Sequence, residues 1–153
     1  APRLRDAMSI ELWVRPAATG MFARLLDKIS QGARDGYLLD LDGGVPRFLM
    51  GGVSVLAGAP LPAQTWTHLA ATYDGATMRL YVDGARQSDT RFHAPPVPDN
   101  PLNDLRIGTA STGYFRFTGL LDEVIVRGRT LRDDEVRASF EAGAAGHCRQ
   151  TSP

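Results

Sequence analysis

Two acidic residues, Asp40 and Asp42, stand two positions apart immediately before Gly43-Gly44. Residues two apart on a strand share a face, so such a pair can direct both carboxylates toward one ligand. Retaining glycoside hydrolysis needs two carboxyl groups flanking the scissile bond, and a Glu-x-Asp-x-Glu run would supply them. The sequence contains no such run. We therefore interpret Asp40-Leu41-Asp42 as a strand end and hairpin turn, with a cation or sugar contact as the alternative.

A second pair of acids, Asp122 and Glu123, lies inside the apolar segment Leu120–Arg127. Neighbours on a strand point to opposite faces, so one carboxylate faces apolar surroundings unless a bulge intervenes. A buried carboxylate must be hydrogen-bonded, neutralised or paired with a cation. Calcium takes roughly six to eight oxygen ligands, more than two acids supply. We predict that Asp122 carries either calcium or structural hydrogen bonds to a neighbouring strand or an arginine.

The residues that perform nucleophilic catalysis or bind zinc are scattered. His68, His93 and His147 show no zinc spacing, and Cys148 is the only cysteine, in a polar tail. The chain has neither a Gly-x-Ser-x-Gly elbow nor a phosphate-binding glycine loop. His68 lies two residues after Trp66 on a predicted strand, which favours a packed structural histidine over a catalytic base. We predict that the chain is not an enzyme.

Exposed aromatic side chains would indicate sugar binding, because their rings stack on the apolar faces of pyranoses. In the predicted strand Tyr114–Phe117, Tyr114 and Arg116 share one side. Trp13 and Tyr81 lie opposite the apolar faces of their own strands. We predict these four residues as ligand-binding candidates. For Trp13, packing beneath loops or a terminal helix is the alternative.

Composition excludes several classes of partner. The chain has 153 residues, which suits one domain, and its 17 basic and 17 acidic side chains cancel. A neutral balance gives no general attraction to nucleic acid or anionic lipid. No apolar run approaches the ~20 residues of a membrane helix. The basic residues are arginine apart from Lys28, a composition typical of GC-rich bacterial genomes.

Apolar residues recur mainly at every second position in short runs, which predicts β-strands. Asp74-Gly75 and Asp83-Gly84 are turn signals between them. The one helical pattern runs from Leu131 to Ala142. About nine strands with one short helix favour an all-β, antiparallel two-sheet sandwich. The predicted strands are Ser9–Arg15, Tyr37–Leu41, Arg47–Met50, Val53–Ala57, Trp66–Tyr73, Met78–Val82, Asp104–Gly108, Tyr114–Phe117 and Leu120–Arg127.

Four stretches in order resemble one known family: SIELWVRP (9–16), WTHLAATYDGATMRLYVDG (66–84), LRIGTA (105–110) and FTGLLDEVIVRGRTLRDDEV (117–136). They resemble the LamG-like (laminin G-like) jelly rolls of the concanavalin A-like lectin/glucanase superfamily. The resemblance implies a jelly-roll sandwich. In the family the acid of the Leu-Asp-Glu-Val motif often lies near calcium, so it also implies calcium as a candidate cofactor at Asp122 and Glu123.

The resemblance and the composition together predict the organisation and role of the chain. We expect an N-terminal lead-in over 1–8 that begins at a cut end, the sandwich over 9–142, and a polar tail over 143–153. We predict a non-catalytic module of a larger secreted or surface protein that recognises carbohydrate. A protein-interaction or structural module of the adhesion, fibre or capsid-decoration type is the alternative. The expected location is extracellular or on a cell or particle surface.

One departure from the family concerns its first strand. Family members usually begin with a strand that pairs beside the one carrying Leu-Asp-Glu-Val, whereas here only the short, polar segment Ala1–Met8 precedes Ser9. An uncovered strand exposes backbone N–H and C=O groups that invite pairing. We therefore predict that Leu120–Arg127 contacts another chain or a missing segment of the parent protein.

Overall fold

The computed structural model describes residues 6–30, 32–93 and 97–150, with side chains of the last helix described through residue 145. Its strands form two five-stranded sheets in which every pairing is antiparallel. Sheet A is ordered β10 (Gly119–Arg127), β1 (Met8–Pro16), β6 (Thr67–Tyr73), β7 (Thr77–Val82) and β8 (Ala85–Arg91). Sheet B is ordered β5 (Val53–Leu56), β4 (Val45–Met50), β3 (Tyr37–Asp42), β2 (Ala23–Lys28) and β9 (Arg106–Ile107).

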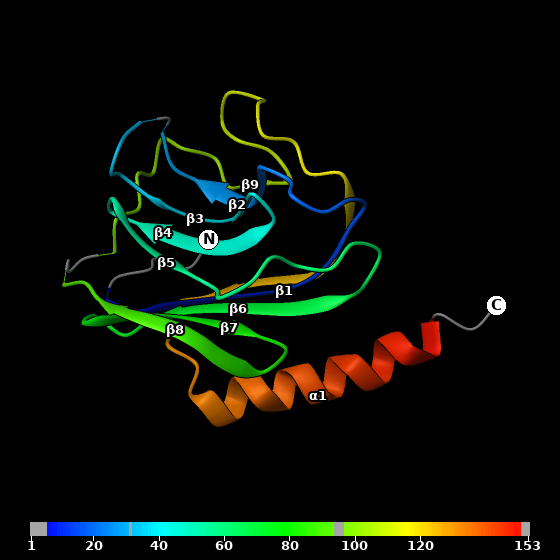
Figure 1. Cartoon of the computed structure of the whole chain (residues 1–153). Helices are drawn as coiled ribbons and strands as arrows, with labels where there is room; N and C mark the ends of the chain where they lie inside the picture. Colours follow the sequence, from blue (N-terminus) through cyan, green and yellow to red (C-terminus); the bar gives the residue numbers. More distant parts are fainter. Residues whose placement is uncertain (1–5, 31, 94–96, 151–153) are drawn as a thin grey trace.

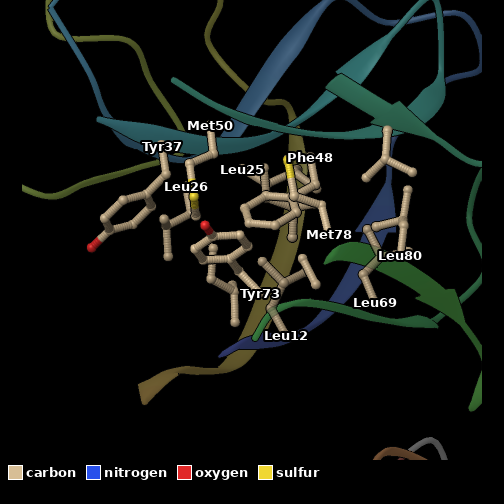
Figure 2. Packing of buried hydrophobic residues seen from close by; sticks show 14 of the residues in the cluster. Leu12, Leu25, Leu26, Tyr37, Phe48, Met50, Leu69, Tyr73, Met78 and Leu80 are labelled. Atoms are coloured by element: carbon tan, nitrogen blue, oxygen red, sulfur yellow. The ribbon is translucent and has the colours of Figure 1, made fainter. Parts of the chain in front are cut away.

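The two sheets stack face to face and bury one core between them (Figure 1). Figure 2 shows Leu12 and Tyr73 of sheet A facing Phe48 and Met50 of sheet B. Alternate residues of most strands fill this layer, as expected for a sandwich. The predicted antiparallel two-sheet sandwich is confirmed.

Helix α1 (Asp133–Gln150) lies against the outer face of sheet A, on the side away from sheet B (Figure 1). Leu131 and Val136 pack there against Ala70 and Tyr81 in a second, smaller cluster. The helix extends beyond the predicted end at Ala142, so residues 143–150 of the predicted tail are helical. The side chain of Cys148 lies outside the described part of the chain.

Glycine-containing hairpins connect several neighbouring strands. Gly43 and Gly44 have φ of 60° and 85°, and Asp83 and Gly84 have φ of 49° and 77°. Two consecutive residues with positive φ are the requirement of the type I′ hairpin, which glycine meets without a steric penalty. The predicted turns at these positions are confirmed.

Two local irregularities depart from the strands predicted by alternation. β8 has no counterpart among the predicted strands, and neither has β2. Its register with β3 shifts between Arg24 and Leu26, and both Leu25 and Leu26 enter the core. A bulge of this kind breaks the period of two, so alternation does not reveal the strand. The predicted strand at 114–117 is wrong, because this segment is a loop in which Phe115 has a φ of 55°.

β10 is one of the two edge strands of sheet A among the described residues, and β8 is the other. β10 pairs with β1 on one side, and its register shifts between Glu11 and Trp13. The N-terminal residues 1–5, part of the predicted lead-in, lie outside the described residues.

No helix within the described residues is both long enough and apolar enough to cross a membrane.

Candidate functional site

Two neighbouring pockets lie over the outer face of sheet B, the face that points away from the core. The larger has a volume of about 280 Å³ and the smaller about 190 Å³. Both are lined by Arg24, Arg47 and Phe115, so they adjoin each other. Together they form one concave region of this face, and we call it the sheet B groove.

The floor of the larger pocket comes from three strands, with Asp27 of β2, Leu38 of β3 and Leu49 of β4. Its walls are two loops far apart in the sequence. One follows β2 and supplies Ser30 and Arg34, and the other precedes β10 and supplies the stretch from Ala110 to Thr112. The smaller pocket adds Phe22, Asp40 and Asp42.

Asp40 organises the floor of the sheet B groove. It faces Arg47 directly across the β3–β4 pairing, where Arg47 Nε donates to Oδ1 at 2.9 Å and Nη2 donates to Oδ2 at 2.7 Å. Arg24 Nη1 also donates to Asp40 Oδ2. Hydrogen bonding to Asp40 raises the pKa of Arg47 above its ordinary value. The prediction that Asp40 and Asp42 sit at a turn is wrong for Asp40, which lies inside β3; Asp42 ends the strand.

Asp27 reaches the same floor because of the bulge in β2. With Leu25 and Leu26 both turned inward, Arg24 and Asp27 both line the larger pocket, and Arg24 Nε lies 3.1 Å from Asp27 Oδ2. The amide of Ile29 donates to Asp27 Oδ1 at 3.2 Å. Burial raises the pKa of Asp27 against the opposing effects of this hydrogen bond and of Arg24.

Phe115 forms the aromatic part of the groove. Its ring is centred 4.9 Å from Arg24 Cζ, a cation–π contact, and its carbonyl accepts a hydrogen bond from the Arg24 amide at 2.8 Å. The residue is 46% exposed. Phe115, Arg24 and Arg47 were not among the predicted site residues. The only sequence signal for this face was the spacing of Asp40 and Asp42.

The predicted residues Tyr114 and Arg116 lie beside the groove rather than among the residues that line its two pockets. Tyr114 is 70% exposed. Arg116 Nε donates to the carbonyl of Gly113 at 3.1 Å within the same loop. Because this segment is a loop and not a strand, the side chains of Tyr114 and Arg116 need not point to the same side, as the predicted strand would have required.

Trp13 and Tyr81, the other two predicted ligand-binding residues, lie between sheet A and α1. Trp13 is 3% exposed and its ring stacks on Phe140 at a centroid distance of 5.8 Å. The hydroxyl group of Tyr81 donates a hydrogen bond to Asp133 Oδ1 at 2.6 Å. Both rings therefore pack under the helix, which for Trp13 is the alternative that the sequence left open.

A third pocket, of about 270 Å³, lies beneath α1 and brings together residues of several elements. Trp13, Glu123, Glu11 and His68 all line it. His68 Nε2 lies 3.4 Å from Glu11 Oε1, and Arg127 pairs with the other carboxylate oxygen. Burial opposes ionisation of Glu11, but hydrogen bonds from His68, Ser139 and Arg127 outweigh it and hold its pKa below the ordinary value. His68 is buried, as a packed structural histidine should be.

Asp122 and Glu123 sit at the bulge where β10 changes register with β1. Glu123 has a φ of 50°, and its amide donates to Asp122 Oδ1 at 2.8 Å. The bulge separates the two acids: Glu123 lines the pocket beneath α1, whereas Asp122 does not. Among the described residues, no group of three or more His, Cys, Asp or Glu side chains is arranged to hold a metal ion. This donor set does not fit a calcium cage, and the calcium predicted at Asp122 and Glu123 is untested.

Comparisons with known proteins agree with this architecture. The family model Laminin_G_3, described as concanavalin A-like lectin/glucanases superfamily, matches residues 2–137. A comparison with curated protein sequences finds no match.

Three solved structures illustrate the range of similar proteins. A Bacteroides ovatus protein assigned as carbohydrate-binding is 17% identical, with a TM-score of 0.73, 86% of this chain and 40% of that chain covered. Domain 4 of AbnA, an extracellular arabinanase of Geobacillus stearothermophilus in complex with arabinotriose, is 19% identical, with a TM-score of 0.63 and 88% and 66% covered. The binding domain of botulinum neurotoxin DC in complex with rat synaptotagmin II is 10% identical, with a TM-score of 0.64 and 92% and 37% covered.

These likenesses establish the fold. The chain spans 40%, 66% and 37% of the length of these three similar chains, so it corresponds to a part of each. By their descriptions, one is a carbohydrate-binding protein, one is a domain in complex with arabinotriose and one is a binding domain, while the superfamily also includes glucanases.

Proposed function

Because this chain belongs to the Laminin_G_3 family of the concanavalin A-like lectin/glucanase superfamily, we propose that it is a non-catalytic glycan-binding module. We place it in a larger secreted or surface protein and assign sugar contact to the sheet B groove. Support for an extracellular place comes from the similar arabinanase domain, which belongs to an extracellular enzyme.

The observation that carries this proposal is that the two pockets share the ring of Phe115 and the guanidinium groups of Arg24 and Arg47. Asp40 holds both guanidinium groups in place. Sugars are bound by stacking of their C–H faces on aromatic rings and by hydrogen bonds from planar polar groups to their hydroxyls. Phe115 supplies a partly exposed ring. Arg24 and Arg47 are held in place by Asp40, so they lose little side-chain entropy when a ligand binds.

The state of the acids in the groove supports binding rather than hydrolysis. A glycosidase needs one carboxyl group that delivers a proton and a second that reaches the sugar or a water molecule. Asp27 and Asp40 are the acids nearest the floor, and both are almost fully buried against arginines. Neither side chain is free to touch a sugar without breaking these pairs. Among the residues that line the groove this leaves Asp42 as the one exposed acid, without the second carboxyl group that hydrolysis needs.

Binding to a panel of soluble oligosaccharides, measured by calorimetry, tests the proposal. We expect Phe115→Ala to lower the affinity for the bound glycan about tenfold, the equivalent of about 1.4 kcal/mol, because the variant loses the ring on which the sugar stacks. Tyr114→Ala is the matched neighbour, and we expect it to bind as the wild type does. Equal binding by wild type and Phe115→Ala, with loss in Tyr114→Ala, would move the site to the residue predicted from the sequence.

A protein-interaction role is the second candidate, and one observation favours it. Leu120 and Ile125 are exposed large apolar side chains on β10, an edge strand of sheet A. Such an edge can accept a strand from a partner chain. A module that binds no glycan in the panel but associates through this edge would favour this alternative.

A further inference from the structure

The two pockets of the sheet B groove differ in the charge that they present to solvent. The larger pocket is lined by Arg24, Arg34 and Arg47 and by a single acid, Asp27. The side chain of Asp27 is 2% exposed, whereas those of Arg24 and Arg47 are 18% and 24% exposed. The charged groups that a ligand meets in this pocket are therefore mainly guanidinium groups.

The smaller pocket presents an acid to solvent. Asp42 lines it with a side chain that is 41% exposed, and Asp42 Oδ2 lies 3.9 Å from Arg47 Nη1, beyond hydrogen-bond distance. Its carboxylate can accept hydrogen bonds from sugar hydroxyls. Phe115 lines both pockets at their junction. The charged side chains thus change from mainly guanidinium groups in the larger pocket to a mixture of guanidinium and carboxylate groups in the smaller pocket.

Arg34 is the cation of the larger pocket with the greatest freedom to bind a ligand. Within the described residues it forms no ion pair with a carboxylate, in contrast to Arg24 and Arg47. Its side chain lies over Gly52, where an added Cβ would stand 2.9 Å from Nε and 3.0 Å from Cδ. Because Gly52 has no side chain, the Arg34 side chain can lie against the backbone of the β4–β5 turn, beside the pocket.

We propose that the larger pocket binds the anionic group of an acidic sugar, with Arg34 and Arg47 as its donors, and that the smaller pocket binds a neutral unit of the same glycan. This inference rests on the proposed function. Guanidinium groups recognise carboxylates and sulfates through paired, charge-assisted hydrogen bonds. The acids behind them, Asp27 and Asp40, are buried and paired, so they do not repel the anion from the surface of the pocket.

The test compares charged oligosaccharides with uncharged counterparts of the same backbone, using the whole chain. A galacturonic acid tetramer and its methyl ester form one pair, and a sulfated carrageenan oligosaccharide and its desulfated form the other. We expect at least one charged ligand to bind about tenfold more tightly than its counterpart, with an advantage that shrinks as salt rises. The pair that shows it identifies the anion as a carboxylate or a sulfate.

Variants then locate the contact. Arg34→Gln should lower the affinity for the charged ligand about tenfold and leave that for its uncharged counterpart unchanged, while Arg34→Lys recovers part of it. Arg91→Gln is the control, because Arg91 is an exposed arginine of β8 on the other sheet. Equal affinity for charged and uncharged ligands overturns the inference but leaves the proposed function standing. Absence of binding to all four ligands, and to the neutral panel, overturns both.

Discussion

Asp40 and Arg47 face each other across β3 and β4 and form a two-pronged ion pair, with N–O distances of 2.9 Å and 2.7 Å. Arg24 joins the same carboxylate from β2. One buried acid therefore connects three strands on the outer face of sheet B and sets the positions of two guanidinium groups. Stability and ligand binding should depend on it together.

We expect Asp40→Asn to lower the free energy of unfolding by about 2–3 kcal/mol, because hydrogen bonds from two charged groups lose their partner. Glycan affinity should fall as well, since Arg24 and Arg47 lose their fixed positions. Urea unfolding and calorimetry measure the two effects. Asp42→Asn is the matched control, expected to change stability by less than about 1 kcal/mol because Asp42 is exposed and lies 3.9 Å from Arg47. An Asp40→Asn protein as stable as wild type would contradict the role assigned to this pair.

The lowered pKa of the Asp35 carboxyl group predicts that the protein loses stability in acid. Its carboxylate accepts hydrogen bonds from the Asn100 side-chain amide at 2.9 Å and from Ser30 Oγ at 2.7 Å. Hydrogen bonds from Asn100 and then Ser30 lower the pKa of Asp35 from 3.8 to about 2. The unfolded state therefore binds the proton more readily, so this contribution is full above pH 3.8 and is lost as the pH falls toward 2.

Unfolding midpoints in urea between pH 5 and pH 2 measure this contribution. We expect Asp35→Asn to be less stable than wild type at pH 5 and to show a shallower decline toward acid. Asp104→Asn, at an exposed acid, should follow the wild-type curve. Parallel curves for wild type and Asp35→Asn would show that Asp35 is not the titrating group.

Gly143 tests how closely α1 packs on sheet A. A Cβ at this position would stand 2.5 Å from Trp13 Nε1 and 2.7 Å from Cε2. Alanine usually stabilises a helix relative to glycine by about 1 kcal/mol. We expect the opposite for Gly143→Ala, a net loss of about 1–3 kcal/mol from overpacking, with a change in tryptophan fluorescence.

The control for the helix is Ala138→Gly at an exposed position of α1. It should cost about 1 kcal/mol through helix propensity and leave tryptophan emission unchanged. A stabilised Gly143→Ala protein would mean that the helix stands further from Trp13 than the structure places it.

β10 should associate with another polypeptide, from a second copy or from the parent protein. We expect concentration-dependent self-association by light scattering, weakened by Leu120→Lys, because a charge on an edge strand opposes pairing. Ile107→Lys on β9, an exposed position at the edge of sheet B, is the matched control and should not change association. A monomer whose amide exchange over 120–127 is as slow as over 67–73 would contradict this prediction.

Calcium at Asp122 is tested by thermal unfolding with and without EDTA. We expect the unfolding temperature to stay the same, because the Glu123 amide already occupies Asp122 Oδ1 and no third metal-binding side chain joins the pair within the described residues. Calcium at a hundred times its Kd would stabilise the fold by about 2.7 kcal/mol. A drop in unfolding temperature of that size with EDTA, abolished by Asp122→Asn, would restore calcium as a ligand of this chain.

Much of the fold follows from local pattern. Alternation predicts β1, β3, β4, β6, β7 and β10, and pairs such as Gly43-Gly44 predict hairpins between them, because side-chain period and turn geometry are properties of neighbouring residues. Local pattern did not predict the full length of α1, which continues past Ala142 to Gln150. Residues 143–150 are polar and small, and helix ends depend on packing as much as on propensity.

The residues of the sheet B groove come together only in the tertiary structure. The bulge at Leu25 puts Arg24 and Asp27 on the same face, although they stand three positions apart. The positive φ of Phe115 turns its loop so that the ring reaches Arg24 from a distant part of the chain. An inserted residue and a left-handed backbone both break the period of two, so no alternation in the sequence could have brought these residues together. Their meeting depends on which strands pair and on where the loops cross the sheet.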